Sequence, residues 1–120
     1  MGSTVEKGKI AEEMALKFLL GKGLRLKARN FRSGHKEIDL IMESSEKLHV
    51  IEVKSLNGDF SSNPSEKVDE RKRRLITSAA SHYVALYGIE KEVQFDVVSI
   101  VKKGTDFELN YLPNAFYPIY

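Results

Sequence analysis

Two acidic residues and a lysine stand out in one short stretch of the chain. The stretch, residues 36–55, reads KEIDLIMESSEKLHVIEVKS and contains Asp39, Glu52 and Lys54. Carboxylate oxygens are the ligands that Mg²⁺ and similar hard cations prefer. A lysine beside them could orient a water or stabilise charge on a phosphate. These residue types therefore point to metal-assisted hydrolysis of a phosphodiester.

The same stretch predicts the β-hairpin that would position these residues. Residues 37–42 read as one strand and residues 48–55 as the other, and the polar run 43–47 reads as the turn. If the hairpin is symmetric about Ser45 and Glu46, every residue of one strand has a defined partner on the other.

That register places like charges opposite each other. Asp39 lies across from Glu52 on one face, with Glu37 across from Lys54, and the other face carries apolar pairs: Ile38 with Val53, and Leu40 with Ile51. Carboxylates directly opposite each other on neighbouring strands repel and destabilise a hairpin, so Asp39 and Glu52 need a cation between them. The alternative is a solvated face on which Glu37 and Lys54 form an ordinary cross-strand ion pair.

A helix is predicted before the hairpin, over residues 5–20. Its apolar stripe repeats at helical spacing and consists of Ala11, Met14, Ala15, Phe18 and Leu19. Glu12 lies at the rim of this stripe. It is either a third carboxylate that points toward the hairpin or a solvated rim residue.

A second helix is predicted from Pro64, with Asn63 as its N-cap, to Tyr87, just before Gly88. Its apolar face consists of Val68, Leu75, Ile76, Ala79, Ala80 and Tyr83. Lys72 falls inside this face, where a lysine is unfavourable unless it is paired or functional. Alternatively its stem packs there while the ammonium group reaches water.

Basic residues offer candidate contacts to a nucleic acid. Arg71, Arg73 and Arg74 fall off the apolar face of the second helix. Arg29 belongs to a strand predicted over residues 24–31, and Arg32 directly follows that strand. A solvated face is the alternative reading of such a run. The net charge of +2 is compatible with a nucleic-acid partner without requiring one.

The remaining elements complete an α/β domain. Strands are predicted over residues 93–101 and near 107–111, with Asp96 either structural or paired with a basic residue, and the closing residues are expected to pack onto the domain. The order α-β-β-β-α-β-β predicts a mixed sheet flanked by helices in a single domain, residues 1–120. The chain has no cysteine and three scattered histidines, which excludes thiolate sites and argues against zinc. With no signal peptide or bilayer-spanning stretch, we expect a cytoplasmic protein with no membrane partner.

The ordered motifs resemble the PD-(D/E)XK nuclease superfamily: a helix glutamate, a strand aspartate, E-x-K on the next strand, and a second helix. Over almost its full length the chain resembles the uncharacterised YraN-like family, which is similar to archaeal Holliday junction resolvases. The matching segments are AEEMALKFL after Gly8, KEIDLI, VIEVKS, KRRL with the following pair of alanines, QFDVV and PNAF. The chain departs from the family pattern at Ala11, Lys36, Leu56 and Gln94, none of which is a proposed metal ligand.

The resemblance implies a restriction-endonuclease-like fold and roles for individual residues. Asp39 and Glu52, with the carbonyl of Val53, would hold Mg²⁺ or Mn²⁺. Lys54 would position the attacking water. The full set of implied catalytic residues is Glu12, Asp39, Glu52, Lys54 and Lys72.

These expectations amount to a metal-dependent DNA endonuclease that hydrolyses phosphodiesters in branched or damaged DNA, and that works as a homodimer if the substrate is symmetric. The alternative is a non-catalytic nucleic-acid-binding or interaction module with a nuclease-like fold.

Overall fold

The computed structural model describes residues 4–57 and 69–119, and they form a mixed α/β fold. The elements are α1 (Thr4–Gly21), β1 (Arg25–Ser33), β2 (Lys36–Glu43), β3 (Lys47–Asn57), α2 (Glu70–Tyr87), β4 (Glu92–Lys103) and β5 (Asp106–Leu112). The predicted order α-β-β-β-α-β-β and the predicted fold class are confirmed. Neither helix in this part of the chain has the length and apolar character that crossing a bilayer requires.

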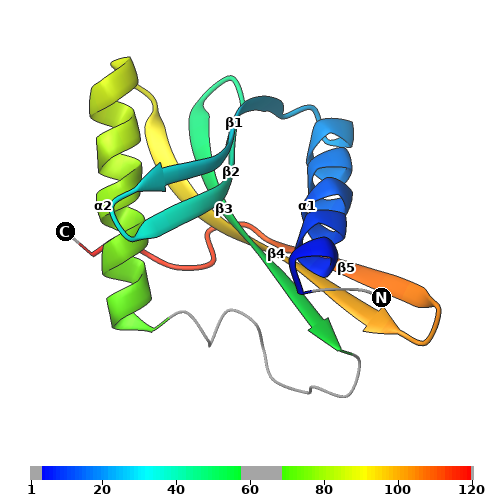
Figure 1. Ribbon diagram of the computed structural model, residues 1–120. Coiled ribbons are helices and arrows are strands. Elements are labelled where there is room, and N and C mark those ends of the chain that lie inside the picture. The colour runs from blue at the N-terminus through cyan, green and yellow to red at the C-terminus, as the bar shows by residue number, and fades with distance from the viewer. Residues whose placement is uncertain (1–3, 58–68, 120) are drawn as a thin grey trace.

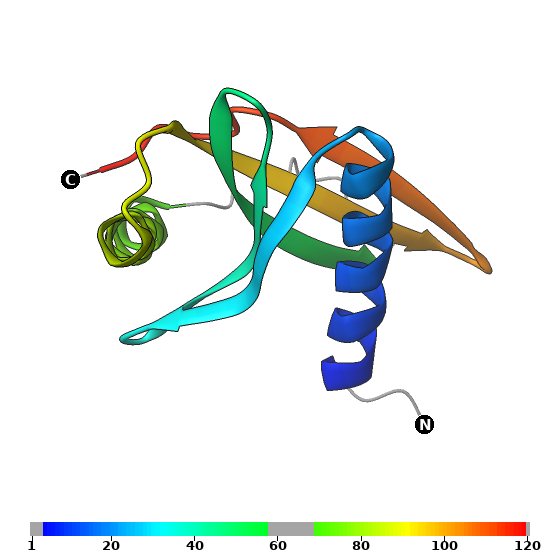
Figure 2. The same cartoon turned by 90° about the horizontal axis from the view of Figure 1, so that it is seen from above.

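The strands form one five-stranded sheet in the order β1-β2-β3-β4-β5. β3 and β4 pair in parallel and the other neighbours pair antiparallel. A parallel pair needs a long crossover, and α2 lies within the connection from β3 to β4. The two helices lie on opposite sides of the sheet (Figures 1 and 2).

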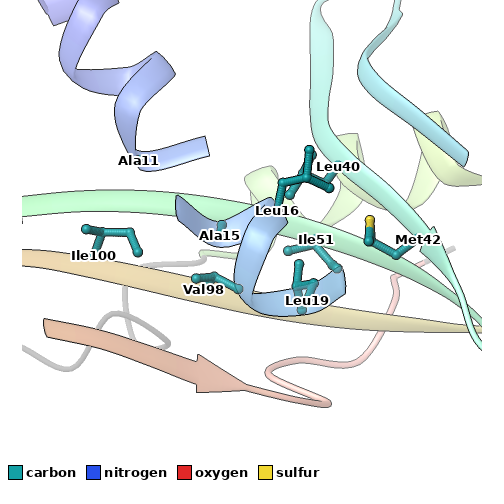
Figure 3. Close-up of a cluster of buried hydrophobic side chains, with 9 residues drawn as sticks. All are labelled: Ala11, Ala15, Leu16, Leu19, Leu40, Met42, Ile51, Val98 and Ile100. Atoms are coloured by element: carbon teal, nitrogen blue, oxygen red, sulfur yellow. The ribbon is translucent and has the colours of Figure 1, made fainter. Parts of the chain in front are cut away.

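Two apolar cores flank the sheet. The α1 core lies beneath α1 and consists of Ala11, Ala15, Leu16, Leu19, Leu40, Met42, Ile51, Val98 and Ile100 (Figure 3). The α2 core lies on the other face and consists of Ile38, Ile41, Leu48, Val50, Ile76, Ala79, Ala80, Tyr83 and Phe95. The β2–β3 hairpin therefore buries side chains on both faces, which fixes its place at the centre of the fold.

The predicted hairpin register is confirmed over the paired residues, from Leu40 opposite Ile51 to Glu43 opposite Leu48. Beyond Leu40 and Ile51 the two strands part. β2 continues beside β1, and β3 continues beside β4 as far as Asn57. We call this divergence the fork. It separates a β1–β2 arm from a β3–β4–β5 arm, as the view from above shows (Figure 2).

The prediction that Ile38 and Leu40 lie on the same face of the sheet is wrong. Ile38 packs in the α2 core, and Leu40 packs in the α1 core. Ile38 and Ile41 are three residues apart yet lie on the same side, as do Ala28 and Phe31 on β1. Alternation would place residues at an odd separation on opposite sides, so both strands change face between these positions.

Asn30 marks the point where the faces change. It has a φ of 51°, in the left-handed region, and it lies between residues of β1 that pair with Leu40 and Ile38. Its neighbour across the strands is therefore Asp39. Asparagine tolerates this backbone conformation better than most residues. The irregularity thus falls at the residue pair from which one predicted metal ligand projects.

The second helix begins later than predicted. Asn63 and Pro64 lie outside the described residues, and α2 starts at Glu70 with Asp69 as its N-cap, which accepts the Lys72 backbone N–H at 2.8 Å. Because Lys72 belongs to the first turn, it is exposed rather than buried in the apolar face, and Leu75 is also exposed at 39%. Val68 lies outside the described residues, and the other members of the predicted face, Ile76, Ala79, Ala80 and Tyr83, are buried as predicted.

The closing residues pack onto the domain, as predicted. Ala115 donates its backbone N–H to the carbonyl of Phe95 at 2.8 Å, and the rings of Phe95 and Phe116 lie 5.3 Å apart. Ile119 donates its backbone N–H to the hydroxyl of Thr77 on α2 at 3.0 Å. The tail therefore ties β4 to α2 and closes one end of the α2 core.

Candidate active site

Asp39 and Glu52 are the first residues beyond the last pair of the hairpin ladder, and they face each other across the fork. The backbone N–H of Val53 donates to Asp39 Oδ2 at 2.7 Å. This bond fixes the aspartate against β3 where the ladder between the strands has ended. The structure thus brings the two predicted carboxylates together.

The two carboxylates resist ionisation. Burial and the charge of Glu52 raise the pKa of Asp39 from 3.8 to about 7, although the Val53 N–H opposes the shift. Burial also raises the pKa of Glu52, with the charge of Lys36 acting against it. Buried carboxyl groups that repel each other are a common feature of functional sites, because a bound cation relieves both effects.

Three lysines surround Glu52. The Lys36 ammonium lies 3.1 Å from Glu52 Oε2, and the charges of Lys54 and Lys72 also lower the pKa of Glu52. Glu52 follows Leu48 and Val50 on the α2 side of β3, which explains why Lys72 on the first turn of α2 can act on it. Both lysines that were predicted at the site therefore lie within electrostatic reach of it.

Glu12 reaches the site from α1. Its two carboxylate oxygens accept hydrogen bonds from Asn30 Nδ2 at 3.1 and 3.3 Å. Its charge also raises the pKa of Asp39. Of the two alternatives for Glu12, the structure supports a carboxylate that faces the hairpin.

Sequence reasoning missed Lys36 and Asn30 as parts of the site. A faint signal existed for Asn30, because asparagine is depleted in strands and enriched at left-handed positions. Lys36 directly precedes the predicted strand and stands three residues before Asp39, on the opposite face by simple alternation. The fork and the face change bring it to Glu52, and neither is visible in the local pattern.

Substitution of Asn30 should separate its backbone role from its side-chain role. We expect Asn30→Ala to lower the free energy of unfolding by about 1–2 kcal/mol, since alanine is strained at positive φ and the bond to Glu12 is lost. Asn30→Gly loses the same bond without the strain, so it should be less destabilised. Urea unfolding of both variants measures the difference, and a glycine variant as unstable as the alanine variant would contradict the backbone argument.

The donor set suits a hard cation with a large share of water ligands. In residues 4–57 and 69–119, no group of three or more His, Cys, Asp or Glu side chains is placed to hold a metal. The fork instead offers two carboxylates, which is typical of Mg²⁺ because that ion keeps several waters. Glu52 Oε1 is buried and has no hydrogen-bond partner among these described residues, and a cation would satisfy it. The residues therefore fit Mg²⁺ or Mn²⁺. Binding of either ion stays a prediction.

The predicted nucleic-acid-binding arginines divide into two groups. Arg29, Arg32 and Arg74 form ion pairs with Glu13, Glu37 and Glu70, at 2.7, 3.0 and 2.8 Å. Arg71 is exposed and Arg73 is half-buried, and neither forms an ion pair with another residue that the structure describes. Their binding role stays a prediction, and the second group is the more available to a phosphate.

The raised pKa of Asp39 predicts how stability depends on pH. The native protein binds the proton of the Asp39 carboxyl group more tightly than the unfolded chain does. The native state is therefore fully stabilised by this proton below about pH 4, and that contribution to the free energy of unfolding is lost as pH rises through about 7. Asp39→Asn cannot ionise, so it avoids this loss of stability, and its amide oxygen still accepts the Val53 N–H. We expect this variant to be more stable than wild type by roughly 2 kcal/mol at pH 8, with the difference vanishing near pH 4.

Urea unfolding at both pH values tests this expectation. Asp106→Asn changes an exposed carboxylate at the start of β5 and is the matched control, for which we expect the wild-type pH profile. A difference between Asp39→Asn and wild type that stays the same at pH 4 and pH 8 would show that burial of the Asp39 charge does not destabilise the fold.

The fold and the site together define a small mixed α/β protein with a buried carboxylate pair at a fork in its sheet. Comparison with known proteins gives the family. Residues 11–100 match the model of the uncharacterised protein family UPF0102. The chain belongs to this family, which confirms the predicted YraN-like resemblance.

Individual relatives match over most of their length. A UPF0102 protein of Porphyromonas gingivalis is 42% identical over 113 residues, which cover 92% of this chain and 84% of the relative. A UPF0102 protein of Phocaeicola vulgatus is 34% identical, with 94% and 93% of the two chains covered. One from Persephonella marina is 36% identical, with 92% of each chain covered.

Proposed function

We propose that this protein is a divalent-metal-dependent endonuclease that hydrolyses phosphodiester bonds in DNA. One observation carries the proposal: Asp39 and Glu52 are held together, partly buried, at a fork in the sheet, and one oxygen of Glu52 has no hydrogen-bond partner in the part of the chain that the structure describes. A domain keeps such a repulsive arrangement when a ligand compensates for it. Mg²⁺ or Mn²⁺ is the ligand that the donor set fits.

Each residue of the site has a role in this proposal. Asp39 and Glu52 hold the cation, with the carbonyl of Val53 as a further ligand. Bound there, the cation supplies a Lewis acid for the phosphate and lowers the pKa of a water. Lys54, two residues after Glu52 on the same face of β3, orients that water and stabilises charge on the phosphate.

Glu12 and Lys72 act from the two helices. The Glu12 carboxylate, held by Asn30, supports a water or a second cation near Asp39. The Lys72 ammonium lies on the α2 side and contributes positive charge beside Glu52. The exposed Arg71, one residue earlier on α2, contacts the DNA backbone in this proposal.

DNA with branches or damage is the substrate class that the family resemblance implies. A four-way junction is symmetric, and cutting it evenly requires two active sites. We therefore extend the proposal to a homodimer on such a substrate.

Cleavage of a labelled DNA panel tests the proposal. Single-stranded, duplex, flap and four-way junction substrates are incubated with Mg²⁺ or Mn²⁺ and with wild type, Lys54→Ala or Lys47→Ala. Lys47 is the matched control, since it pairs with Glu92 at the turn end of β3, far from the fork. Cleavage that requires the cation and Lys54, and that Lys47→Ala retains, supports the proposal. Cleavage that Lys54→Ala retains would assign the activity to a contaminant or to another site.

A non-catalytic nucleic-acid-binding module is the second candidate. It is favoured by the ion pair between Lys36 and Glu52, which partly neutralises the acidic site without any metal. This candidate predicts DNA binding that weakens steeply with salt, no cleavage of any substrate, and no dependence on Mg²⁺. Fluorescence anisotropy over a salt series, run beside the cleavage panel, distinguishes the two.

A further inference from the structure

Lys36 contacts the carboxylate pair directly, through Glu52. Its ammonium lies 3.1 Å from Glu52 Oε2, within hydrogen-bond distance. The side chains of both residues are largely buried, at 22% and 16% exposed. The charge of Lys36 acts on Asp39 as well as on Glu52. One ammonium group therefore serves both carboxylates of the site.

The position of Lys36 in the fold makes this contact unusual. Lys36 begins β2 and pairs with Ser33 of β1, so its backbone belongs to the β1–β2 arm. Glu52 belongs to the other arm, beyond the last pair of the β2–β3 ladder. The lysine side chain thus crosses the open fork to reach the glutamate. Its flexible four-carbon stem allows the ammonium to withdraw without any change in the backbone.

The contact leaves the site incompletely satisfied. Lys36 bonds one oxygen of Glu52, and Glu52 Oε1 stays buried with no hydrogen-bond partner from any residue that the structure describes. A single ammonium donates along fixed directions, whereas a divalent ion can bind oxygens from both residues at once. Lys36 therefore neutralises the pair only in part.

We propose that Lys36 is a built-in counter-cation of the Asp39–Glu52 pair, that a divalent metal ion displaces it, and that the released ammonium then binds a phosphate of the DNA. This inference rests on the proposed function and adds a form of regulation to it. Lys36 and the metal ion compete for Glu52, so the lysine weakens metal binding in the free protein. Once the metal is bound, the ammonium is released at the mouth of the fork and strengthens DNA binding.

The inference predicts effects of opposite sign from one substitution. Lys36→Met keeps the length of the side chain and removes its charge. We expect it to bind Mn²⁺ about tenfold more tightly than wild type when no DNA is present. In the presence of saturating Ca²⁺, which occupies the site without supporting turnover in this design, we expect it to bind a junction several-fold more weakly.

Two control variants complete the experiment. Lys36→Arg keeps a positive charge in reach of Glu52 and should not bind Mn²⁺ more tightly than wild type. Lys47→Met removes a different lysine that pairs with a carboxylate, that of Glu92, and should match wild type in both assays. Free Mn²⁺ is measured by electron paramagnetic resonance at pH 8, and circular dichroism verifies that each variant is folded.

The outcomes separate this inference from the proposed function. Tighter Mn²⁺ binding by Lys36→Met alone supports the inference. If wild type binds Mn²⁺ and Lys36→Met binds it equally or less tightly, the competition is refuted while the metal site stands. If Mn²⁺ binds only to Lys36→Met, the lysine closes the site, and metal-dependent cleavage by wild type is refuted. If no folded variant binds Mn²⁺, both ideas fail.

A spectroscopic signal adds a test of displacement itself. In wild type, the ¹⁵N-detected ammonium resonance of Lys36 should shift when Mg²⁺ is added, as its bond to Glu52 breaks. The resonance of Lys47 is the internal reference and should not move. A Lys36 resonance that stays unchanged at saturating Mg²⁺ would contradict displacement.

Discussion

Replacing Glu52 by glutamine is expected to reduce metal-dependent DNA cleavage by about 10³-fold or more. Glutamine has nearly the same shape as glutamate but carries no negative charge, and its amide group brings hydrogens to a place where the site needs an acceptor. The loss should be large because Glu52 is one of the two carboxylates that face each other across the fork, and its buried Oε1 has no hydrogen-bond partner within residues 4–57 and 69–119. Cleavage of the preferred substrate is measured at saturating Mg²⁺.

The control for this prediction is Glu92→Gln. Glu92 begins β4 and pairs with Lys47 at 2.7 Å, but its side chain is 76% exposed and lies at the turn end of the hairpin. We expect wild-type cleavage from this variant. Because Glu52→Gln removes a buried charge, its melting temperature should stay within a few degrees of wild type, so inactivity cannot be attributed to unfolding. Cleavage by Glu52→Gln within tenfold of wild type would place the metal elsewhere.

The central hairpin was predictable because its determinants are local. A polar turn between two strands leaves few possible registers, and only one places Leu40 opposite Ile51. That register alone brings Asp39 to Glu52. The order of the elements was likewise predictable from apolar periodicity, since helices and strands repeat with different periods.

The orientation of β2 could not be predicted in the same way. Strand periodicity assumes an unbroken alternation, and here the alternation is interrupted at Asn30 on a different strand, opposite Asp39. The interruption places Ile38 in the α2 core. Whether one asparagine in a strand adopts a left-handed conformation depends on its partner in the sheet, which the local pattern does not specify.

Charge pairing between distant elements was also beyond sequence reasoning. Arg29 meets Glu13 of α1, and Lys36 crosses the fork to Glu52. The partners in these pairs are far apart in the sequence, and each needs the tertiary fold to be known first. The exposure of Lys72 also depends on the fold, because α2 begins only at Glu70 and Lys72 therefore lies in its first turn.

The interactions of Asp96 were predicted only in part. A basic partner was predicted as one alternative, and His49 supplies it, with Nδ1 2.8 Å from Asp96 Oδ2. His49 itself carried no signal in the sequence. The parallel pairing of β3 with β4 brings the two together, and parallel partners cannot be read from adjacent residues.

Asp96→Ala is expected to lower the free energy of unfolding by about 4 kcal/mol, a large part of the stability of a domain of this size. The carboxylate is fully buried and accepts four hydrogen bonds, from His49 Nδ1, Gln94 Nε2, Tyr111 Oη and the backbone N–H of Asn114. These donors come from three strands and the closing segment. Alanine would leave them without an acceptor in a site that water cannot readily enter.

The charge of Asp96, rather than its volume, should account for much of this loss, and the pH dependence can show it. Burial alone would raise the pKa of Asp96, but the hydrogen bonds, led by that from His49, outweigh burial and hold the pKa below its ordinary value. The contribution of the ionised Asp96 to the free energy of unfolding is therefore complete above about pH 4 and is lost as pH falls through the lower native pKa.

Asp96→Asn should lose about half as much stability as Asp96→Ala, because its amide oxygen still accepts two of the hydrogen bonds. In urea unfolding, the gap between wild type and Asp96→Asn should narrow below pH 4, while Asp106→Ala, an exposed change, should match wild type throughout. A gap of constant size at every pH would assign the loss to packing instead of charge.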